Sequence, residues 1–229
     1  MTDVAVFLIE SDGLKGRTVV ERFISSVNYP DIDIRVVVDG PDGKAIQTLD
    51  RLEIPYTVAA DPAAPSDAIE RVTSNDDGIR YLITCGWVHK IPNTSISMAD
   101  NAINCHSSYL PGYKGRCTYR PQWAHAESKG GATIHFLTEK FDEGAIICRE
   151  EFVISSWDSP LDIAYKYSDI TTPLLREAML LLDEGFSGKS HDGGRYYPTI
   201  PWTTTIAHGI INHISRGFGS DWRWEIEPS

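Results

Sequence analysis

Short apolar runs alternate with segments of helical spacing along the first 106 residues. The runs have the length and composition of buried strands. A helix between two strands supplies the crossover that parallel pairing needs, so the alternation predicts βαβ units, a mainly parallel sheet and an α/β fold. We expect strands at residues 4–9, 32–38, 55–59, 79–84 and 101–106, and helices at residues 14–26, 45–52 and 66–73, the last with Ser66 as its N-cap.

The second half of the sequence has a different pattern. Residues 133–137 and 145–154 resemble two strands about eight residues apart, which favours an antiparallel pair. Ser159 and Pro160 then begin a long helix, because serine is a good N-cap and proline is tolerated in the first turn. Pro173 lies inside that helix and predicts a kink or a break.

The charge of the chain limits its partners. The 229 residues carry 21 basic and 32 acidic side chains, a net charge of −11 with neutral histidine. This balance argues against nucleic acid and anionic membranes as partners. The sequence has no apolar run of the roughly 20 residues that a spanning helix needs. It starts without a basic region, and its four cysteines form no CxxC pair, so we expect a cytoplasmic protein with free thiols.

Three short motifs carry little weight. Gly13 and Gly16 form GxxG after the first strand rather than the GxGxxG of a dinucleotide site. The sequence around Lys189 lacks the first glycine of a P-loop and follows a helix. His208 and His213 are five residues apart, which is not the spacing of a helical zinc pair, so we expect no metal site.

Asn104, His106 and Asp142 are the strongest candidates for chemistry. Asn104 and His106 share one face at the end of a strand, where open parallel sheets bind ligands, and Asp142 lies in a turn that can reach back to them. An amide can stabilise an oxyanion, an imidazole can move a proton and a carboxylate can orient it, which suits acyl transfer to an amine. The spacing alone favours a histidine packed in the core, because Asn, His and Asp at such intervals often occur by chance. Cys105 points to the opposite face and is expected to be a core thiol.

The sequence around these residues resembles the folate-dependent formyltransferase family. Four motifs of that family occur in order: Asn-x-His with a serine-containing turn ending in Leu-Pro, a Lys-Gly step, Gly-x-Thr-x-His and Asp-x-Gly-x-Ile-Ile. They occupy residues 104–111, 114–115, 131–135 and 142–147, and a looser likeness covers roughly residues 1–185. One departure is Ser107, where many members have proline.

The resemblance implies a Rossmann-like, mainly parallel twisted sheet of the formyltransferase type, with N10-formyltetrahydrofolate as the formyl donor. Asn104, His106 and Asp142 would be catalytic, and the pterin would lie between residues 85–91 and 136–142. For Trp87 and Ile91, plain core packing is an equal alternative. The residues expected to hold the donor are Gly86, Trp87, Val88, Ile91, Phe136, Leu137 and Phe141, and those expected to hold the acceptor are Ser107, Tyr109, Tyr113, Lys114 and Arg116.

Members of this family differ in their acceptor. Glu10 and Asp12 lie where glycinamide ribonucleotide enzymes bind a phosphate, and would repel it. Methionyl-tRNA enzymes are longer, and the charge of this chain does not suit tRNA. Formyltetrahydrofolate hydrolases share the His-Ser-x-Leu-Pro wording but normally carry a regulatory domain. We therefore expect a nucleotide-linked amino sugar. Hydrolysis, glycinamide ribonucleotide formylation and non-catalytic folate binding are the alternatives.

A local basic stretch can accommodate an anionic substrate despite the acidic total. Between residues 107 and 130 there are four basic side chains and one acidic one, a net charge of +3: Lys114, Arg116, Arg120 and Lys129 against Glu127.

The last part of the chain has its own composition. From about His191 it is rich in glycine, threonine and aromatic residues and shows no long periodic element, so we divide the chain into a catalytic domain of residues 1–190 and an extension of residues 191–229. The extension could close over the acceptor, pack on a second subunit of a homodimer, or cover its own domain. Its aromatic residues include Trp202, Phe218, Trp222 and Trp224.

Overall fold

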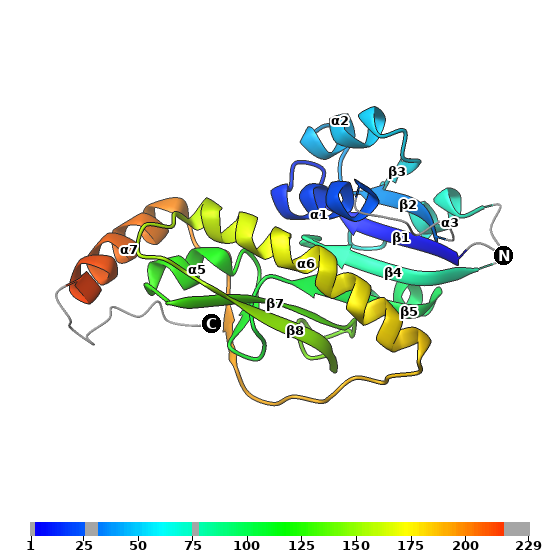
Figure 1. Cartoon of the computed structure of the whole chain (residues 1–229). Helices are drawn as coiled ribbons and strands as arrows, with labels where there is room; N and C mark the ends of the chain where they lie inside the picture. The colour runs from blue at the N-terminus through cyan, green and yellow to red at the C-terminus, as the bar shows by residue number, and fades with distance from the viewer. Residues whose placement is uncertain (1–2, 26–31, 75–77, 218–229) are drawn as a thin grey trace.

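A seven-stranded sheet forms the centre of the computed structural model, which describes residues 3–25, 32–74 and 78–217 (Figure 1). The strand order is β3-β2-β1-β4-β5-β7-β8; the first five strands are parallel, and β7 and β8 are antiparallel. The sheet confirms the expected α/β fold and the antiparallel pair. The strands are β1 (Asp3–Ile9), β2 (Ile32–Val38), β3 (Tyr56–Val58), β4 (Ile79–Cys85), β5 (Ala99–His106), β7 (Lys129–Phe136) and β8 (Ile146–Val153).

Helices cover both faces of this sheet, so the central strands are apolar on both sides. In β1, Phe7 packs in a core with α1 and α6, and Leu8 points into a second core with α3. The first core lies under α1 (Leu14–Ser25), α2 (Lys44–Arg51) and α6 (Pro160–Asp183), and the second lies under α3 (Ser66–Val72) and α4 (Asn93–Ile96).

Helix α6 begins as the sequence predicts. The Ser159 hydroxyl accepts from the backbone N–H of Asp162 and the Asp162 carboxylate accepts from that of Ser159, a complete capping box. The helix continues through Pro173 without the predicted break. Pro173 lies on the exposed side, where water can solvate the carbonyl that loses its donor. No helix in the described part of the chain is both long and apolar enough to cross a membrane.

The N-cap prediction for Ser66 is wrong. Helix α3 already includes Ser66, and Pro65 precedes it without a side-chain cap. The Ser66 hydroxyl lies 2.7 Å from the Ser95 hydroxyl instead, so it makes a hydrogen bond to a distant residue rather than a capping bond to its own helix.

The prediction of an extension without a long element is also wrong. Helix α7 (Trp202–Gly217) packs on α5 (Tyr119–Ala124), and β9 (Arg195–Tyr197) pairs with β6 (Tyr113–Gly115). Gly209 allows the close approach, because a Cβ there would lie 1.9 Å from the Trp123 ring. Glycine and threonine are weak helix formers, so the sequence of this segment did not predict α7. Phe218, Trp222 and Trp224 lie outside the described residues.

Candidate active site

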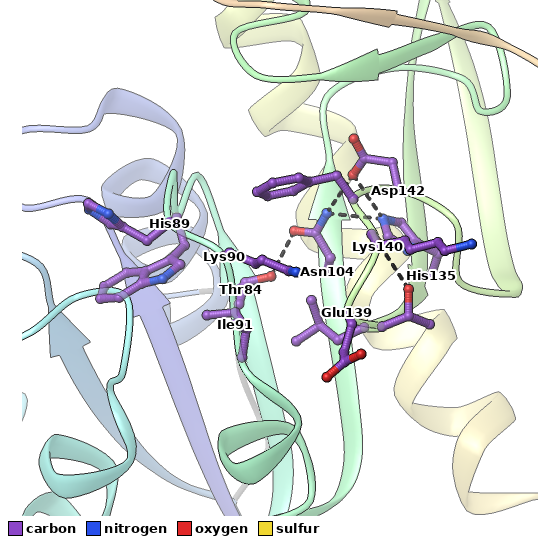
Figure 2. Close-up of a pocket in the computed structure, with 13 residues that line it drawn as sticks. Thr84, His89, Lys90, Ile91, Asn104, His135, Glu139, Lys140 and Asp142 are labelled. Atoms are coloured by element: carbon purple, nitrogen blue, oxygen red, sulfur yellow. Dashed lines mark hydrogen bonds and ion pairs between the residues drawn. The ribbon is translucent and has the colours of Figure 1, made fainter.

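Asn104 lies at the end of β5, between two polar neighbours on adjacent strands (Figure 2). In the sheet register Thr84 of β4 is beside Asn104 on one side, and His135 of β7 is beside it on the other. The His135 Nδ1 lies 2.9 Å from the Phe136 carbonyl oxygen and therefore carries a proton, which leaves Nε2 as an acceptor. The Asn104 Nδ2 donates to it at 3.0 Å, and the Thr84 hydroxyl donates to the Asn104 Oδ1 at 2.8 Å. The amide orientation is thus determined from both sides.

Asp142 reaches this strand end from the loop between β7 and β8. Its φ of 55° is left-handed, a conformation that aspartate tolerates better than most residues. Gly144 lets the loop lie tightly against β7, since a Cβ there would lie 1.8 Å from the Phe136 carbonyl oxygen. The Gly115 backbone N–H donates to the Asp142 Oδ2 at 2.7 Å and holds the carboxylate in place.

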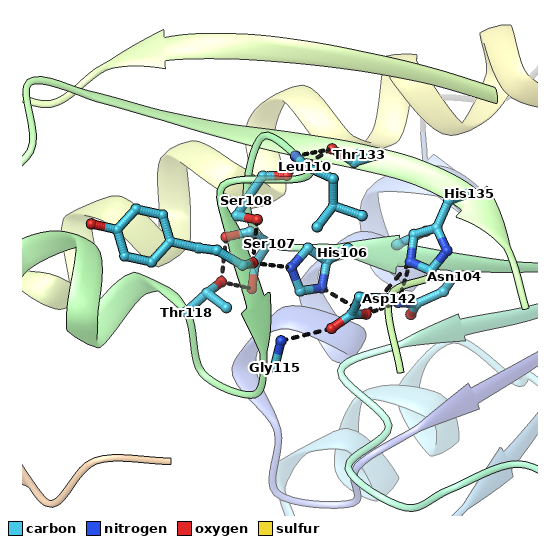
Figure 3. Close-up of polar contacts among 12 residues, drawn as sticks. Asn104, His106, Ser107, Ser108, Leu110, Gly115, Thr118, Thr133, His135 and Asp142 are labelled. Carbon is cyan, nitrogen blue, oxygen red and sulfur yellow. Dashed lines mark hydrogen bonds and ion pairs between the residues drawn. The ribbon is translucent and has the colours of Figure 1, made fainter. Parts of the chain in front are cut away.

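His106 connects Asp142 to the backbone (Figure 3). Its Nδ1 lies 3.2 Å from the Asp142 Oδ1, and its Nε2 lies 2.7 Å from the Tyr113 carbonyl oxygen. Both nitrogens face oxygen acceptors, an arrangement that a doubly protonated imidazolium satisfies. His106 and Asp142 are 4% and 7% exposed, so water screens the pair weakly.

His106 keeps Asp142 ionised. Burial by itself would raise the pKa of this carboxyl group, but attraction to His106 and the hydrogen bond from it outweigh burial and hold the pKa well below its usual range. The group is therefore a fixed negative charge at neutral pH.

Two pockets meet at these residues. The first, which we call the aromatic pocket, lies between the loop after β4 and the segment after β7 (Figure 2). The second, the polar pocket, lies on the β1 side. Four residues line both pockets: Trp87, Asn104, Phe141 and Asp142. A group bound in one pocket therefore meets a group bound in the other beside Asn104 and Asp142.

The residues expected to hold a folate lie close to these pockets, with one exception. Phe136 lies outside both linings and packs on the sheet core. Trp87 and Ile91 belong to the second core and also line the aromatic pocket, so the two alternatives for them are compatible. Leu137 and Phe141 line the aromatic pocket, and Gly86 and Val88 line the polar pocket.

Only two of the five residues expected at the acceptor line the polar pocket, Ser107 and Arg116. The Tyr109 ring lies under the Arg149 guanidinium at 4.2 Å. The Tyr113 ring stacks on another tyrosine, and the Lys114 ammonium pairs with a glutamate. These last three side chains lie outside the linings of both pockets.

The predicted basic stretch does not form one positive surface. Lys114 pairs with Glu143 at 2.8 Å, and Lys129 pairs with Glu151 at 2.7 Å. The Arg120 guanidinium donates to a carbonyl before α7 and stacks on the Trp202 ring at 4.3 Å. The net charge of residues 107–130 overstates the positive surface, because lysines of this stretch form ion pairs with glutamates from other segments.

Sequence reasoning missed four residues of the site. His135 is the last residue of the Gly-x-Thr-x-His motif, but we did not predict a function for it. Thr84 has no sequence signal beyond its place at the end of a strand. Glu10 and Lys15 line the polar pocket from β1 and α1, although we treated that turn only as acidic. Their convergence depends on the strand order, which a single sequence does not specify.

His106, His135 and Asp142 bring potential metal ligands within 4.8 Å of one another. Hydrogen bonds already engage the relevant atoms: the Asn104 amide occupies the His135 Nε2, and the His106 Nδ1 faces Asp142. The arrangement suits proton transfer and oxyanion stabilisation, the chemistry of acyl transfer.

Fold and site together define an α/β protein with an acyl-transfer centre between two pockets. Residues 5–179 match the formyl transferase family model, and the chain belongs to this family. The GDP-perosamine N-formyltransferase of Brucella melitensis is 29% identical over 145 residues, which cover 63% of this chain and 54% of that protein. The formyltetrahydrofolate deformylase of a Corynebacterium is 25% identical over 133 residues, covering 58% of this chain and 46% of that protein. The chain thus spans about half the length of these curated relatives.

A solved structure shows the same fold. The N-formyltransferase of Helicobacter canadensis, in complex with folinic acid and dTDP-3-aminofucose, superposes with a TM-score of 0.65 at 16% identity. The match covers 95% of this chain and 82% of that one. The formyltransferase fold expected from the sequence is confirmed.

Proposed function

We propose that this protein transfers the formyl group of N10-formyltetrahydrofolate to the primary amine of a nucleotide-linked amino sugar. The observation that carries the proposal is the position of Asn104, His106 and Asp142 where the two pockets meet. The names of the Brucella relative and of the ligands in the Helicobacter structure support the choice of folate and amino sugar.

The donor would occupy the aromatic pocket. Apolar side chains from two facing segments, among them Ile91 and Leu137, form a slot suited to a flat ring. Asn104 lines this pocket as well as the polar pocket, so a formyl group on N10 would lie beside the catalytic residues where the two pockets meet. The acceptor would enter through the polar pocket.

The reaction needs no nucleophile from the protein, because the acceptor amine attacks the formyl carbon itself. Negative charge then develops on the formyl oxygen. The Asn104 Nδ2 donates one N–H to His135 and the other, in a long and weak hydrogen bond of 3.5 Å from Nδ2 to Oδ1, to Asp142. The oxyanion would replace this weak contact and accept from the second N–H. The imidazolium of His106 adds positive charge on the same side.

Collapse of the tetrahedral intermediate forms the product amide and breaks the bond from carbon to N10. The acceptor nitrogen loses a proton and N10 gains one. The imidazolium of His106 gives a proton to N10 and takes up the proton that the acceptor nitrogen loses, which restores the charged form that Asp142 stabilises. In the hydrolase alternative, water replaces the amine and formate is released; the Corynebacterium relative favours that alternative as the second candidate.

The test is a panel assay. The protein is incubated with N10-formyltetrahydrofolate and nucleotide-linked 3-amino and 4-amino sugars, with glycinamide ribonucleotide included, and products are read by mass spectrometry. We expect one or more amino sugars to gain a formyl group. Folate deformylation with formate release and no acylated sugar would favour the hydrolase. Folate binding without turnover would identify a binding protein.

A homodimer is a further part of the proposal. Helix α7 exposes an apolar stripe at intervals of four residues, a surface that a second copy could cover. The stripe consists of Trp202, Ile206, Ile210 and Ile214. Sedimentation of the whole chain tests this, and an Ile210→Glu variant should shift any dimer toward monomer.

Thr84→Val is expected to lower kcat about three- to tenfold, the effect of losing one hydrogen bond to the catalytic amide. KM for the folate should change little, because the variant keeps its shape. Thr84→Ser restores the hydroxyl and should restore kcat. Equal loss in both variants, or a change confined to KM, would contradict a role in orienting Asn104.

A further inference from the structure

Lys15 places an ammonium group in the polar pocket. It lies in the first turn of α1, directly after β1, and its Nζ donates to the Ser107 Oγ at 2.8 Å. Ser107 immediately follows His106, so this cation lies next to the catalytic residues although it comes from a distant part of the chain.

Two linked hydroxyl groups hold the ammonium in place, and Figure 3 shows both of them, on Ser107 and Thr118. The Thr118 hydroxyl donates to the Ser107 carbonyl oxygen at 2.6 Å, which uses its only proton. The Ser107 hydroxyl, 2.9 Å away, must therefore donate to the Thr118 Oγ1 and accept from Lys15. Proline, which many family members carry at position 107, has no hydroxyl for this purpose. Ser107 therefore supplies an anchor for the half-buried ammonium of Lys15 that a proline at this position would lack.

The direct contacts of Lys15 are with neutral groups, although the carboxyl group of Glu10 in the same pocket also attracts its charge. The ammonium lies 5.9 Å from the Tyr119 ring centre and 5.5 Å from that of Tyr167, and its hydrogen-bond partner is a neutral hydroxyl. Among the described residues, no carboxylate lies within ion-pair distance of it, whereas Lys114 and Lys166 each have one.

The charges around the polar pocket are mixed. The Arg116 guanidinium donates to the Val88 carbonyl oxygen on the same rim. Glu10 is the other carboxyl group of the lining besides Asp142. Burial and the nearby Asp39 raise the pKa of Glu10, and the charges of Lys15 and His89 oppose this shift.

We infer that Lys15, anchored by Ser107, is the specificity-determining residue that binds an anionic oxygen group of the acceptor, a phosphoryl or a carboxylate group. An ammonium ion with neutral partners in a partly enclosed pocket attracts an anion more strongly than a paired surface lysine does. Glu10, which lines the same pocket, would accept from the hydroxyl or ammonium groups of the same molecule. The inference rests on the proposed function, since it assigns the polar pocket to the acceptor.

The first experiment measures binding without turnover. Pyrophosphate, UDP, GDP, dTDP and acetate are titrated by calorimetry into the wild type, Lys15→Met and Lys44→Met. Methionine keeps the length and the ring contacts of Lys15, and Lys44 is an exposed lysine at the start of α2 outside the polar pocket. We expect at least one anion to bind the wild type and Lys44→Met equally, and Lys15→Met about tenfold or more weaker, as for loss of a charge-assisted hydrogen bond. Phosphate-bearing probes and acetate distinguish the two sources of the anion.

The second experiment uses any acceptor that the panel identifies. Lys15→Met should raise KM for that acceptor about tenfold or more while KM for N10-formyltetrahydrofolate is unchanged, and Ser107→Ala should have a smaller effect in the same direction. Absence of anion binding in the wild type, or equal anion affinity in Lys15→Met, overturns the inference. Formyl transfer by the wild type would in that case still support the proposed function. Lys15-dependent anion binding without formyl transfer to any amine would support the inference about Lys15 and contradict the proposed function.

Discussion

We expect the Asp142→Asn variant to lose kcat by about three to four orders of magnitude, as when an aspartate that orients a catalytic histidine is neutralised. The asparagine keeps the shape of the side chain and can still accept from the Gly115 backbone N–H. It removes the negative charge that faces the His106 Nδ1 at 3.2 Å, so the imidazolium loses its counter-charge. Steady-state kinetics with the acceptor from the panel measures the loss.

The control for Asp142→Asn is Asp192→Asn, an exposed aspartate that should keep wild-type kinetics. Folate affinity separates catalysis from binding, and we expect Asp142→Asn to bind the folate close to normally. Retention of a tenth or more of the wild-type kcat would contradict the role of Asp142.

The pKa of Asp142 also determines a pH dependence. Its folded-state value is depressed, so the ionised group stabilises the fold above its unfolded value of about 3.9. This contribution disappears only as the pH falls below that value toward the folded one. A decline in activity between about pH 7 and 5 would therefore report a different group, because Asp142 stays ionised throughout that range.

The sequence predicts the sheet well because burial leaves a direct record in it. Strands such as β1 and β4, covered on both faces, must be apolar along their length, and turns and caps separate them. The shared face of Asn104 and His106 follows from strand periodicity alone. The prediction that Asp142 would reach them depended on a turn between two recognisable strands.

The errors have a common physical cause, which is contact between distant segments. Lys114 and Lys129 find carboxylates on other strands or loops, so a local charge count overstates the positive field. Lys15 enters the polar pocket only because β1 and β5 lie on either side of β4. Helix α7 is stabilised by packing on α5, which propensity does not reveal.

His106→Asn is expected to lower kcat by about two to four orders of magnitude, the range of a lost general acid or base. The imidazole spans the Tyr113 carbonyl oxygen and the Asp142 carboxylate, and the shorter amide of asparagine cannot reach both. The oxyanion donor Asn104 remains, so residual transfer should exceed the uncatalysed rate.

The pH profile of His106→Asn distinguishes a proton-transfer role from a structural one. If His106 carries the proton between the acceptor nitrogen and N10, removing the imidazole should abolish the part of the pH dependence of kcat that His106 causes. The pH profile of the variant should then be flatter than that of the wild type. His208→Asn, on α7 and outside both pockets, should keep both the rate and the profile. An unchanged profile at reduced rate would instead mean that His106 acts by holding Asp142 in place, and the proton exchange would then have to pass through solvent.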